Sequence, residues 1–329
     1  MSALAPTLQA FFTDRLIRQR QASPHTVAGY RDTLRLLLGF AAERLGTEPS
    51  KLDFDDLDAP LIGAFLEHLE HDRGNGVRTR NARLAAIRSL FRYAAFRHPE
   101  HSAVIERVLA IPPKRFERSL VTFLTEAEVN GLLAAPDRAT WAGRRDHAML
   151  GLAAQTGLRA SELIGLRYAD VHLGAGAHVS CVGKGRKQRI TPLTAGMVDV
   201  LRVWLVERAG QAAEPLFATR SGRALSRDAL ECRLAKHATT AAQACPSLRE
   251  KKVTPHVLRH TAAMRLLHAG VDTAVIALWL GHEQLETTQI YLHADLTIKE
   301  RALARTTPAD TKPGRYRPPD AILAFLEAL

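Results

Sequence analysis

The sequence predicts a mainly helical α+β protein with two domains and one small antiparallel β-sheet, and three observations support this fold class. The chain has 329 residues, which suggests about two domains at roughly 100–200 residues each. Most apolar residues recur at helical spacing, whereas one segment near residue 180 has the pattern of a hairpin. A basic, proline-containing stretch separates the two parts, so we expect domains at 1–100 and 123–305 and a linker at 101–122.

Three amphipathic helices are expected in the first domain. The first spans residues 23–45, because Ser23 favours a helix start and Gly46 a stop. Asp58 opens the second helix, and the third runs over residues 79–94. Beyond these helices we expect irregular chain up to the second domain.

The second domain is expected to be helical apart from one hairpin. Residues 178–182 and 188–193 have strand composition and flank a glycine-containing turn. Thr254 provides the cap of a later helix, and the short apolar helix 272–280 stops at Gly281.

Composition and charge restrict the class of protein. Hydrophobic residues make up 46% and charged residues 24%, as in an ordinary folded domain. Lys and Arg number 45 against 34 Asp and Glu, a net charge of +11 that predicts a polyanionic partner. Nucleic acid is favoured over an acidic membrane, because no basic amphipathic helix with an aromatic face stands out.

Several other classes are not supported by the sequence. No apolar run approaches the roughly 18–20 residues that would cross a bilayer, and no signal peptide is recognisable, so we expect a cytoplasmic protein without membrane contact. The three cysteines form no Cys-x-x-Cys pair, which argues against a disulfide framework and a cysteine zinc site.

An arginine-rich stretch without any acidic residue covers residues 73–97. A surface helix that is merely solvated usually carries Glu partners, so we expect these side chains to contact DNA phosphates. The expected DNA-binding residues are Arg73, Arg78, Arg80, Arg83, Arg88 and Arg92, with Lys114 and Arg115 in the linker.

Arg159 lies near the start of a predicted helix, directly after a glycine-containing turn. A cation is disfavoured at a helix N-terminus, so a bound anion would resolve the conflict. A salt bridge to Glu162, three residues later, explains the pattern equally well.

A second candidate segment places His256 and Arg259 on one face of the helix that Thr254 opens. His256 and His260 also have the spacing of a zinc-binding helix. Val257 occupies the position where such a helix carries its general-base Glu, so zinc is disfavoured. Tyr291, further along the chain, could by itself be a buried core tyrosine.

The chain carries in succession an arginine, a hairpin lysine, a histidine, a second arginine, a second histidine and a tyrosine, and this set suits a reaction at a phosphodiester. From about residue 10 to 300 the chain resembles the tyrosine recombinase family, which includes phage integrases and Xer-type enzymes. The resemblance implies an N-terminal helical SAM-like core-binding domain that clamps DNA, followed by a helical catalytic domain with a small antiparallel sheet.

The resemblance also implies roles for individual residues. Arg159 and Arg259 would bind the scissile phosphate, Tyr291 would be the nucleophile, and Glu162 would be an accessory acid beside the first arginine. The family needs no metal and no nucleotide cofactor.

Further roles fall on the hairpin and the histidines. Lys184, near the hairpin tip, matches the lysine that protonates the departing 5′ oxygen. Its neighbours Arg186 and Lys187 are expected DNA-binding residues, and either could complicate that assignment. His256 and His282 match the groups that assist proton movement and bind phosphate.

These expectations describe a site-specific recombinase or integrase that forms a 3′-phosphotyrosine intermediate for a mobile element or for replicon resolution. Its expected partner is double-stranded DNA with short inverted core sites, bound by a homotetramer or by a heterotetramer with a sister recombinase, in the nucleoid. Two alternatives stay open: a type IB topoisomerase-like enzyme that relaxes DNA, and a catalytically auxiliary DNA-binding partner.

The C-terminal part, residues 306–329, is expected to form a proline-rich tail that ends in a short apolar helix at 320–329. So short a helix needs a partner surface, either on its own chain or on a neighbouring protomer. The family resemblance favours the neighbouring protomer.

Overall fold

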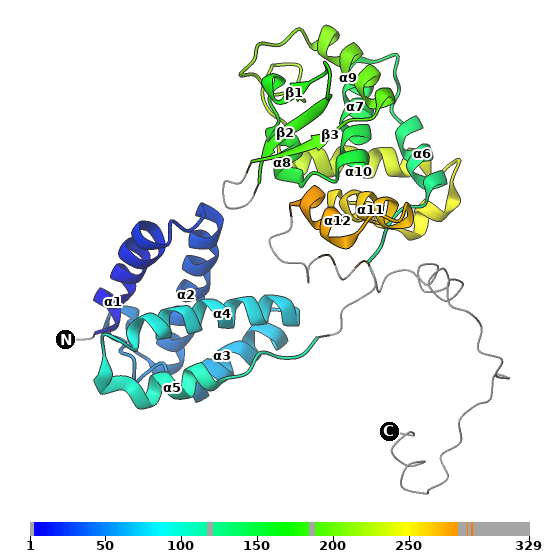
Figure 1. Ribbon diagram of the computed structural model, residues 1–329. Helices are drawn as coiled ribbons and strands as arrows, with labels where there is room; N and C mark the ends of the chain where they lie inside the picture. The colour runs from blue at the N-terminus through cyan, green and yellow to red at the C-terminus, as the bar shows by residue number, and fades with distance from the viewer. Residues whose placement is uncertain (1–2, 117–120, 184–187, 282–287, 289–290, 292–329) are drawn as a thin grey trace, which may run out of the picture. The chain divides into compact units, whose positions relative to one another are not determined.

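The computed structural model describes residues 3–116, 121–183 and 188–281, together with residues 288 and 291 (Figure 1). The chain divides into two compact units, Met1–Arg118 and Ser119–Leu329. The expected tail at 306–329 lies outside the described residues.

The first unit is built from helices around one apolar core. Its elements are α1 (Leu4–Ala10), the π-helical segment η1 (Phe11–Gln19), α2 (Pro24–Leu45), η2 (Pro49–Lys51), α3 (Ala59–His71), α4 (Val77–Ala94), η3 (Pro99–His101) and α5 (Ser102–Ala110). The sequence had not indicated the N-terminal helical stretch formed by α1 and η1.

Local capping chemistry sets the limits of the predicted helices. The Ser23 hydroxyl accepts a hydrogen bond from the Thr26 amide at the start of α2, and Gly46 ends that helix in the left-handed region, φ 63°. Asp58 caps α3 through the Leu61 amide. The three helices predicted for this domain are confirmed, with α4 starting two residues earlier than the predicted residue 79, at Val77.

The chain after Pro99 is not irregular, so the expectation for the start of the linker was wrong. Residues Ser102–Ala110 form α5, and Ile105 and Val108 on this helix are buried in the core of the first unit. Helix α4 also holds the chain beyond α5, because the Asn81 side chain donates to the Lys114 carbonyl and accepts from the Lys114 amide. Residues up to 114 therefore belong to the first unit.

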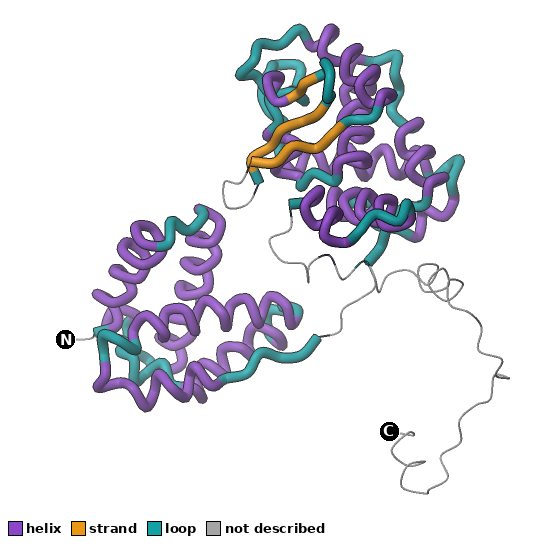
Figure 2. The backbone as a smooth tube through the Cα atoms, viewed as in Figure 1, coloured by secondary structure: helices purple, strands orange, loops and turns teal. Residues whose placement is uncertain are grey.

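The second unit combines helices with one small sheet (Figures 1 and 2). Its elements are α6 (Glu126–Ala134), α7 (Trp141–Thr156), α8 (Ala160–Gly165), η4 (Tyr168–Asp170), β1 (Val171–His172), β2 (His178–Val182), β3 (Gln188–Pro192), α9 (Ala195–Arg208), α10 (Arg227–Ala241), η6 (Pro246–Glu250), α11 (Pro255–His268) and α12 (Thr273–Leu280).

The sheet is antiparallel with strand order β1-β2-β3. Strands β2 and β3 form the predicted hairpin, with Cys181 paired to Arg189 and Val182 paired to Gln188. Strand β1 adds a short edge that the sequence had not indicated. The mainly helical fold class with a small antiparallel sheet is confirmed.

Helix α7 lies at the centre of the second unit and packs against α6, α9 and α11. Its side chains Met149, Leu150 and Leu152 are fully buried. Helix α11 packs in turn on α12, as Figure 1 shows. This packing brings the C-terminal ends of α7 and α12 close to α11, where the candidate site lies.

Candidate active site

Arg259 lies in the first turns of α11, and its guanidinium group joins the ends of two other helices. The helix begins at Pro255 after the Thr254 cap, as predicted. The Arg259 Nη1 donates to the Gly157 carbonyl at 2.6 Å, and Nη2 donates to the Leu280 carbonyl at 2.7 Å. Both acceptors lie at helix C-terminal ends, which carry partial negative charge.

Arg159 is the N-cap residue of α8, and the structure shows one of the two alternatives that the sequence left open. Its Nη1 donates to Glu162 Oε1 at 2.8 Å, so the predicted salt bridge is present. Its Nη2 donates to the Gly281 carbonyl at 3.0 Å, which points this side chain to the same helix end that Arg259 contacts. Because 29% of the side chain is exposed, a ligand can still reach it.

Two glycines in the left-handed region allow these elements to meet. Gly157 ends α7 with φ 63°, and a Cβ on it would lie 2.7 Å from Leu280 Cδ2. Gly281 ends α12 with φ 65°, and a Cβ there would lie 2.5 Å from an Arg189 nitrogen. No other residue type combines that backbone conformation with such close approach.

A third arginine that the sequence analysis missed completes the cluster. Arg189 on β3 donates to Glu162 Oε2 at 2.7 Å and to the Leu280 carbonyl. The Arg159, Arg189 and Arg259 guanidinium groups thus surround one carboxylate and one helix end. Burial, with the charges of Arg159 and Arg189, lowers the pKa of Arg259 to about 10, so this arginine is still charged at neutral pH. Several guanidinium groups lie close to a single carboxylate, and this excess of cationic side chains favours an anion.

Tyr291 is 1% exposed and packs on α11 and α12, against apolar side chains that include Met264 and Ile276. Its hydroxyl lies 3.1 Å from the Nδ1 atom of His260. Burial raises the pKa of Tyr291, although the charges of Arg259 and Arg159 oppose this change. The expected nucleophile and the arginine pair are therefore held by the same two helices.

His260 is the second residue that the sequence analysis missed as part of the site, since it had been considered only for zinc. Burial, with the charges of His256 and Arg259, lowers its pKa to about 4, so the ring is neutral at neutral pH. Its position next to Arg259 and four residues after His256 was the available signal.

His256 lies at the N-terminal end of α11, 6.4 Å from His260 between ring centroids. Partial burial and the charges of Arg227 and Arg259 lower its pKa. Across the part of the chain that the structure describes, no group of three or more His, Cys, Asp or Glu side chains could hold a metal ion. The expected residues Lys184, Arg186, Lys187 and His282 lie outside the described residues.

The arginine-rich stretch of the first unit does not form a single exposed face, contrary to the sequence expectation. Arg80 is 7% exposed and donates to the Pro112 carbonyl, and Arg88 donates to the Leu109 carbonyl at 2.6 Å. Arg83 lies 3.4 Å from the Thr33 hydroxyl and is partly buried. Arg80 and Arg88 thus hold the C-terminal end of α5 and the chain that leaves it, whereas Arg83 contacts α2.

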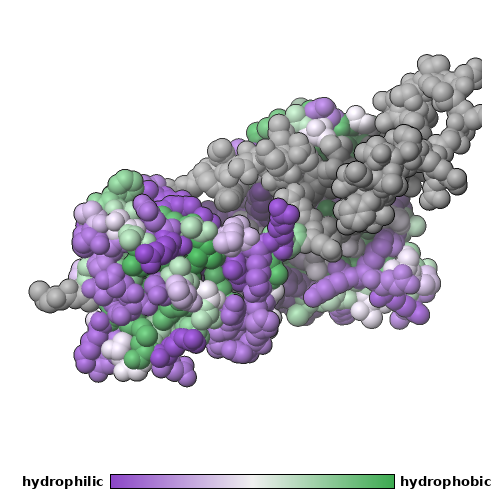
Figure 3. Space-filling view, turned by 90° about the horizontal axis from the view of Figure 1, so that it is seen from below, coloured by the Kyte–Doolittle hydropathy of each residue, from purple (hydrophilic) through white to green (hydrophobic). Residues whose placement is uncertain are grey.

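Other members of the stretch remain at the surface. Of the expected DNA-binding residues, Arg73, Arg78 and Arg92 in this stretch and Lys114 and Arg115 beyond it are exposed. Arg78 lies over the Phe116 ring at 5.0 Å, and Lys114 pairs with Glu70 at 2.6 Å. The described surface seen in Figure 3 is mainly hydrophilic, with apolar residues between the polar ones.

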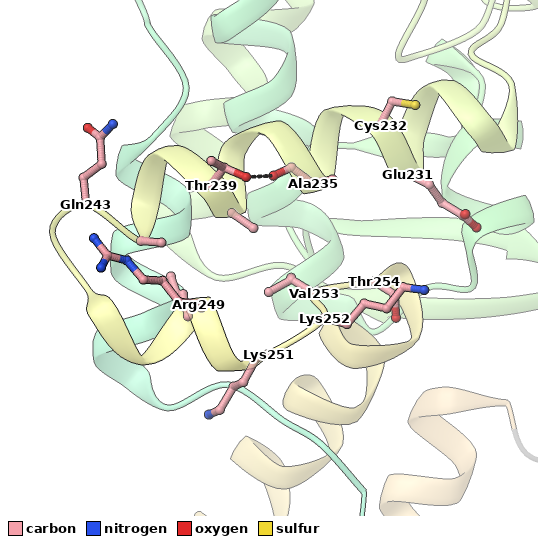
Figure 4. A pocket seen from close by; sticks show the side chains of 13 residues that line it. Glu231, Cys232, Ala235, Thr239, Gln243, Arg249, Lys251, Lys252, Val253 and Thr254 are labelled. Atoms are coloured by element: carbon pink, nitrogen blue, oxygen red, sulfur yellow. Dashed lines mark hydrogen bonds between the residues drawn. The ribbon is translucent and has the colours of Figure 1, made fainter.

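An open groove of about 700 Å³ lies between α10 and the segment that precedes α11 (Figure 4). Figure 4 shows Arg249 and Gln243 at one end of this groove and Lys252 at the other. The lining ends at Thr254, the cap of α11, and includes neither Arg159 nor Arg259. The groove therefore borders the helix of the candidate site without being part of it.

An arginine cluster beside a buried tyrosine, on a helical unit with a small sheet, suits an enzyme that acts on phosphodiesters. The profile described as phage integrase family matches residues 122–297, and that of the phage integrase N-terminal SAM-like domain matches residues 10–98. The chain belongs to the phage integrase family of tyrosine recombinases, enzymes that cleave and rejoin DNA. The family identified from the sequence is confirmed.

Individual relatives agree with this family. The Sinorhizobium fredii protein y4rC, whose name places it among integrase/recombinases, is 58% identical over 328 residues, which cover 100% of this chain and 99% of the relative. The tyrosine recombinase XerC of Xanthomonas campestris is 34% identical over 90% of this chain and 85% of its own length.

Solved structures show the same fold. The XerH recombinase bound to a palindromic difH substrate has a TM-score of 0.70 at 23% identity, over 87% of this chain and 81% of that one. The Tn1549 transposon integrase bound to transposon right end DNA has a TM-score of 0.66 at 18% identity, over 91% of this chain and 98% of that one. In the described parts of this chain, no helix is both long and apolar enough to cross a membrane.

Proposed function

We propose that this protein is a site-specific recombinase that cuts and rejoins duplex DNA through a 3′-phosphotyrosine intermediate at Tyr291. The observation that supports this proposal best is that α11 and α12 hold both the Arg159–Arg259 pair and Tyr291. In the reaction, the tyrosine oxygen attacks phosphorus and the bond from phosphorus to the 5′ oxygen breaks. The number of phosphate ester bonds stays the same, so rejoining needs no ATP.

The two arginines would bind the non-bridging oxygens of the scissile phosphate. In the structure their Nη2 groups donate to helix-end carbonyls, with Arg259 contacting Leu280 and Arg159 contacting Gly281. A phosphate is a stronger acceptor than a carbonyl, because it adds a full negative charge to the hydrogen bond. The same donors would stabilise the additional charge of the transition state.

Proton transfer requires an acceptor for the phenol and a donor for the 5′ oxygen. We assign the donor role to Lys184, and proton and phosphate assistance to His256 and His282, as the family resemblance implies. His260 holds the Tyr291 hydroxyl at 3.1 Å and has a neutral ring. Tyr291 must leave this buried position to reach a phosphate on bound DNA.

The substrate proposed here is double-stranded DNA with short inverted core sites, held by both units and paired in a tetramer of this chain or with a sister recombinase. The first unit, Met1–Arg118, would clamp DNA, residues 123–305 would perform the reaction, and residues 306–329 would dock on a neighbouring subunit. The DNA complexes of XerH and the Tn1549 integrase support this use of the fold. We propose a role in a mobile element or in replicon resolution.

The test is covalent capture on a nicked suicide substrate, from which cleavage releases a short strand and prevents rejoining. Wild-type protein should form an adduct, and Tyr291→Phe should form none while it still binds DNA. Tyr168→Phe is the matched control, because this partly buried tyrosine of the same unit also donates a hydrogen bond, to the Leu205 carbonyl at 3.2 Å. An adduct that persists in Tyr291→Phe would refute the proposal.

A further inference from the structure

We propose that Arg189 is a positioning residue for DNA cleavage, which acts by fixing the Glu162 carboxylate and, through it, the guanidinium group of Arg159. This inference rests on the proposed function. It adds a residue that neither the family resemblance nor the sequence pattern assigned to the site.

The contacts of Glu162 show how the fixing works. Its side chain is only 4% exposed. Its Oε1 accepts from Arg159 Nη1 at 2.8 Å, while Oε2 accepts from the Arg159 backbone amide at 2.8 Å and from Arg189 Nη2 at 2.7 Å. Both oxygens of the carboxylate are thus occupied, and Arg189 supplies the contact that comes from outside helix α8.

The second contact of Arg189 joins the carboxylate to the other catalytic arginine. Arg189 Nη1 donates to the Leu280 carbonyl, which also accepts from Arg259 at 2.7 Å. One side chain therefore bridges the partner of Arg159 and the partner of Arg259. An arginine suits this role because its planar group presents several donors in a fixed arrangement, which a lysine cannot do.

This bridge matters for catalysis because the arginines must bind a developing charge without first reorganising. Without Arg189, the Glu162 carboxylate would keep, among the described residues, contacts only with Arg159 at the start of its own helix, and the two side chains could rotate together. Residues that orient a directly acting group commonly change the rate by about 10–100-fold, as measured for the partners of metal ligands.

A purely structural role for Arg189 is the alternative, and the chain contains a close match for comparison. Arg208 in the same unit pairs with Glu214 at 2.7 Å and is 12% exposed, against 10% for Arg189. The Nε atoms of both arginines are buried and have no partner among the described residues. In the part of the chain that the structure describes, Arg208 contacts neither Glu162 nor the two arginines Arg159 and Arg259.

The experiment measures the single-turnover rate of adduct formation on the suicide substrate at saturating DNA, together with DNA affinity and melting temperature. Arg189→Gln should lower the rate by about tenfold or more and change DNA affinity by less than about threefold. Arg208→Gln should keep the rate within about twofold and lower the melting temperature less than Arg189→Gln does, because its partner Glu214 is 42% exposed against 4% for Glu162. Arg189→Lys should recover only part of the rate, because it restores the charge but not both contacts.

A double variant tests the path through Glu162. In a Glu162→Gln background, where the charged acceptor is gone, Arg189→Gln should cost less than about threefold in rate. A rate for Arg189→Gln equal to that of Arg208→Gln, or a full additional loss in the double variant, would overturn the inference. If wild-type protein forms no adduct that depends on Tyr291, the proposed function fails and this inference fails with it; a normal Tyr291 adduct leaves the proposed function intact whatever Arg189 does.

Discussion

Two networks of arginine and carboxylate in the second unit contain the same chemical groups but differ in how they are enclosed. In the first, Asp146 accepts from Arg145 Nη2 at 2.7 Å, and the ring of His237 lies 2.9 Å away. Both Arg145 and Asp146 are nearly fully buried. In the second, Glu162 holds Arg159, whose side chain is 29% exposed.

The difference lies in the acceptors of the arginines. Arg145 donates to Asp146 and to the Ala218 carbonyl, and its guanidinium lies over the Trp141 ring at 5.3 Å. All of its contacts are internal, so this network stabilises the fold. Arg159 and Arg259 donate to carbonyls at one helix end, where a more strongly charged acceptor can replace them. Arg259 is itself 5% exposed, so the partly exposed Arg159 is what opens this network to the proposed phosphate.

The largest effect on stability is expected when the enclosed network loses its charge. Asp146→Asn should lower the free energy of unfolding by about 3–5 kcal/mol, because a buried arginine then has no carboxylate partner. Glu162→Gln should cost less stability, because Arg159 is 29% exposed and the buried Arg189 keeps its bond to the Leu280 carbonyl, and it should reduce adduct formation as well. Urea unfolding of both variants measures this. Equal stability losses would remove the distinction between the two networks.

The Asp146 network and the His260–Tyr291 pair should also respond to different ranges of pH. Burial acts to raise the pKa of Asp146, but hydrogen bonds from His237 and Arg145 outweigh it, so the pKa is lowered. The ionised Asp146 therefore stabilises the fold until the pH falls below about 4. Burial lowers the pKa of His260 to about 4 in the folded protein. Between about pH 4 and about 6.5, the unfolded chain therefore binds more protons at this histidine than the folded protein does. Stability should therefore fall as pH drops from about 6.5 to about 4.

His260→Asn should make that fall shallower, and urea midpoints measured between pH 4 and 7 check it. His147 and His256 also have lowered pKa values, so the slope should decrease without disappearing. The exposed His172 supplies the control variant His172→Asn, which should keep the wild-type slope. An unchanged slope in His260→Asn would show that this histidine is not buried as a neutral ring beside Tyr291.

The smallest effect concerns the first unit, where enclosed and exposed arginines also occur together. Replacing the exposed Arg73 and Arg92 with Ala should flatten the plot of log DNA affinity against log salt by up to about two units, one per phosphate contact. Arg80→Ala should instead lower stability, because its guanidinium donates to the Pro112 carbonyl. If Arg80→Ala changed the salt dependence of DNA affinity and the Arg73/Arg92 double variant did not, the assignment of exposed arginines to DNA and of the enclosed arginine to stability would be wrong.

The parts of the fold that depend on neighbouring residues could be predicted from the sequence. Ser23, Asp58 and Thr254 cap their helices as expected, because a cap involves atoms only a few residues apart. Helix α5 was missed, since its Ile105 and Val108 are explained only by packing against distant helices.

The candidate site was predictable to a similar extent. Order and chemistry along the chain indicated Arg159, Arg259 and Tyr291, but nothing local showed which partners they have. Arg189 contacts Leu280, which lies 91 residues away, and His260 contacts Tyr291 across 31 residues. Such pairs are set by the packing of helices α11 and α12 with the sheet, which spacing alone does not reveal. The same limit explains why Arg80 and Arg92 could not be distinguished by sequence.

The most direct test of the account is to identify the residue that becomes attached to DNA. The adduct from the suicide substrate would be digested with protease and nuclease, and the remaining peptide sequenced by mass spectrometry. The account predicts a nucleotide phosphate on the phenolic oxygen of Tyr291, in the peptide that follows α12. Attachment to any other residue, Tyr168 included, or an active protein that forms no covalent adduct, would contradict it.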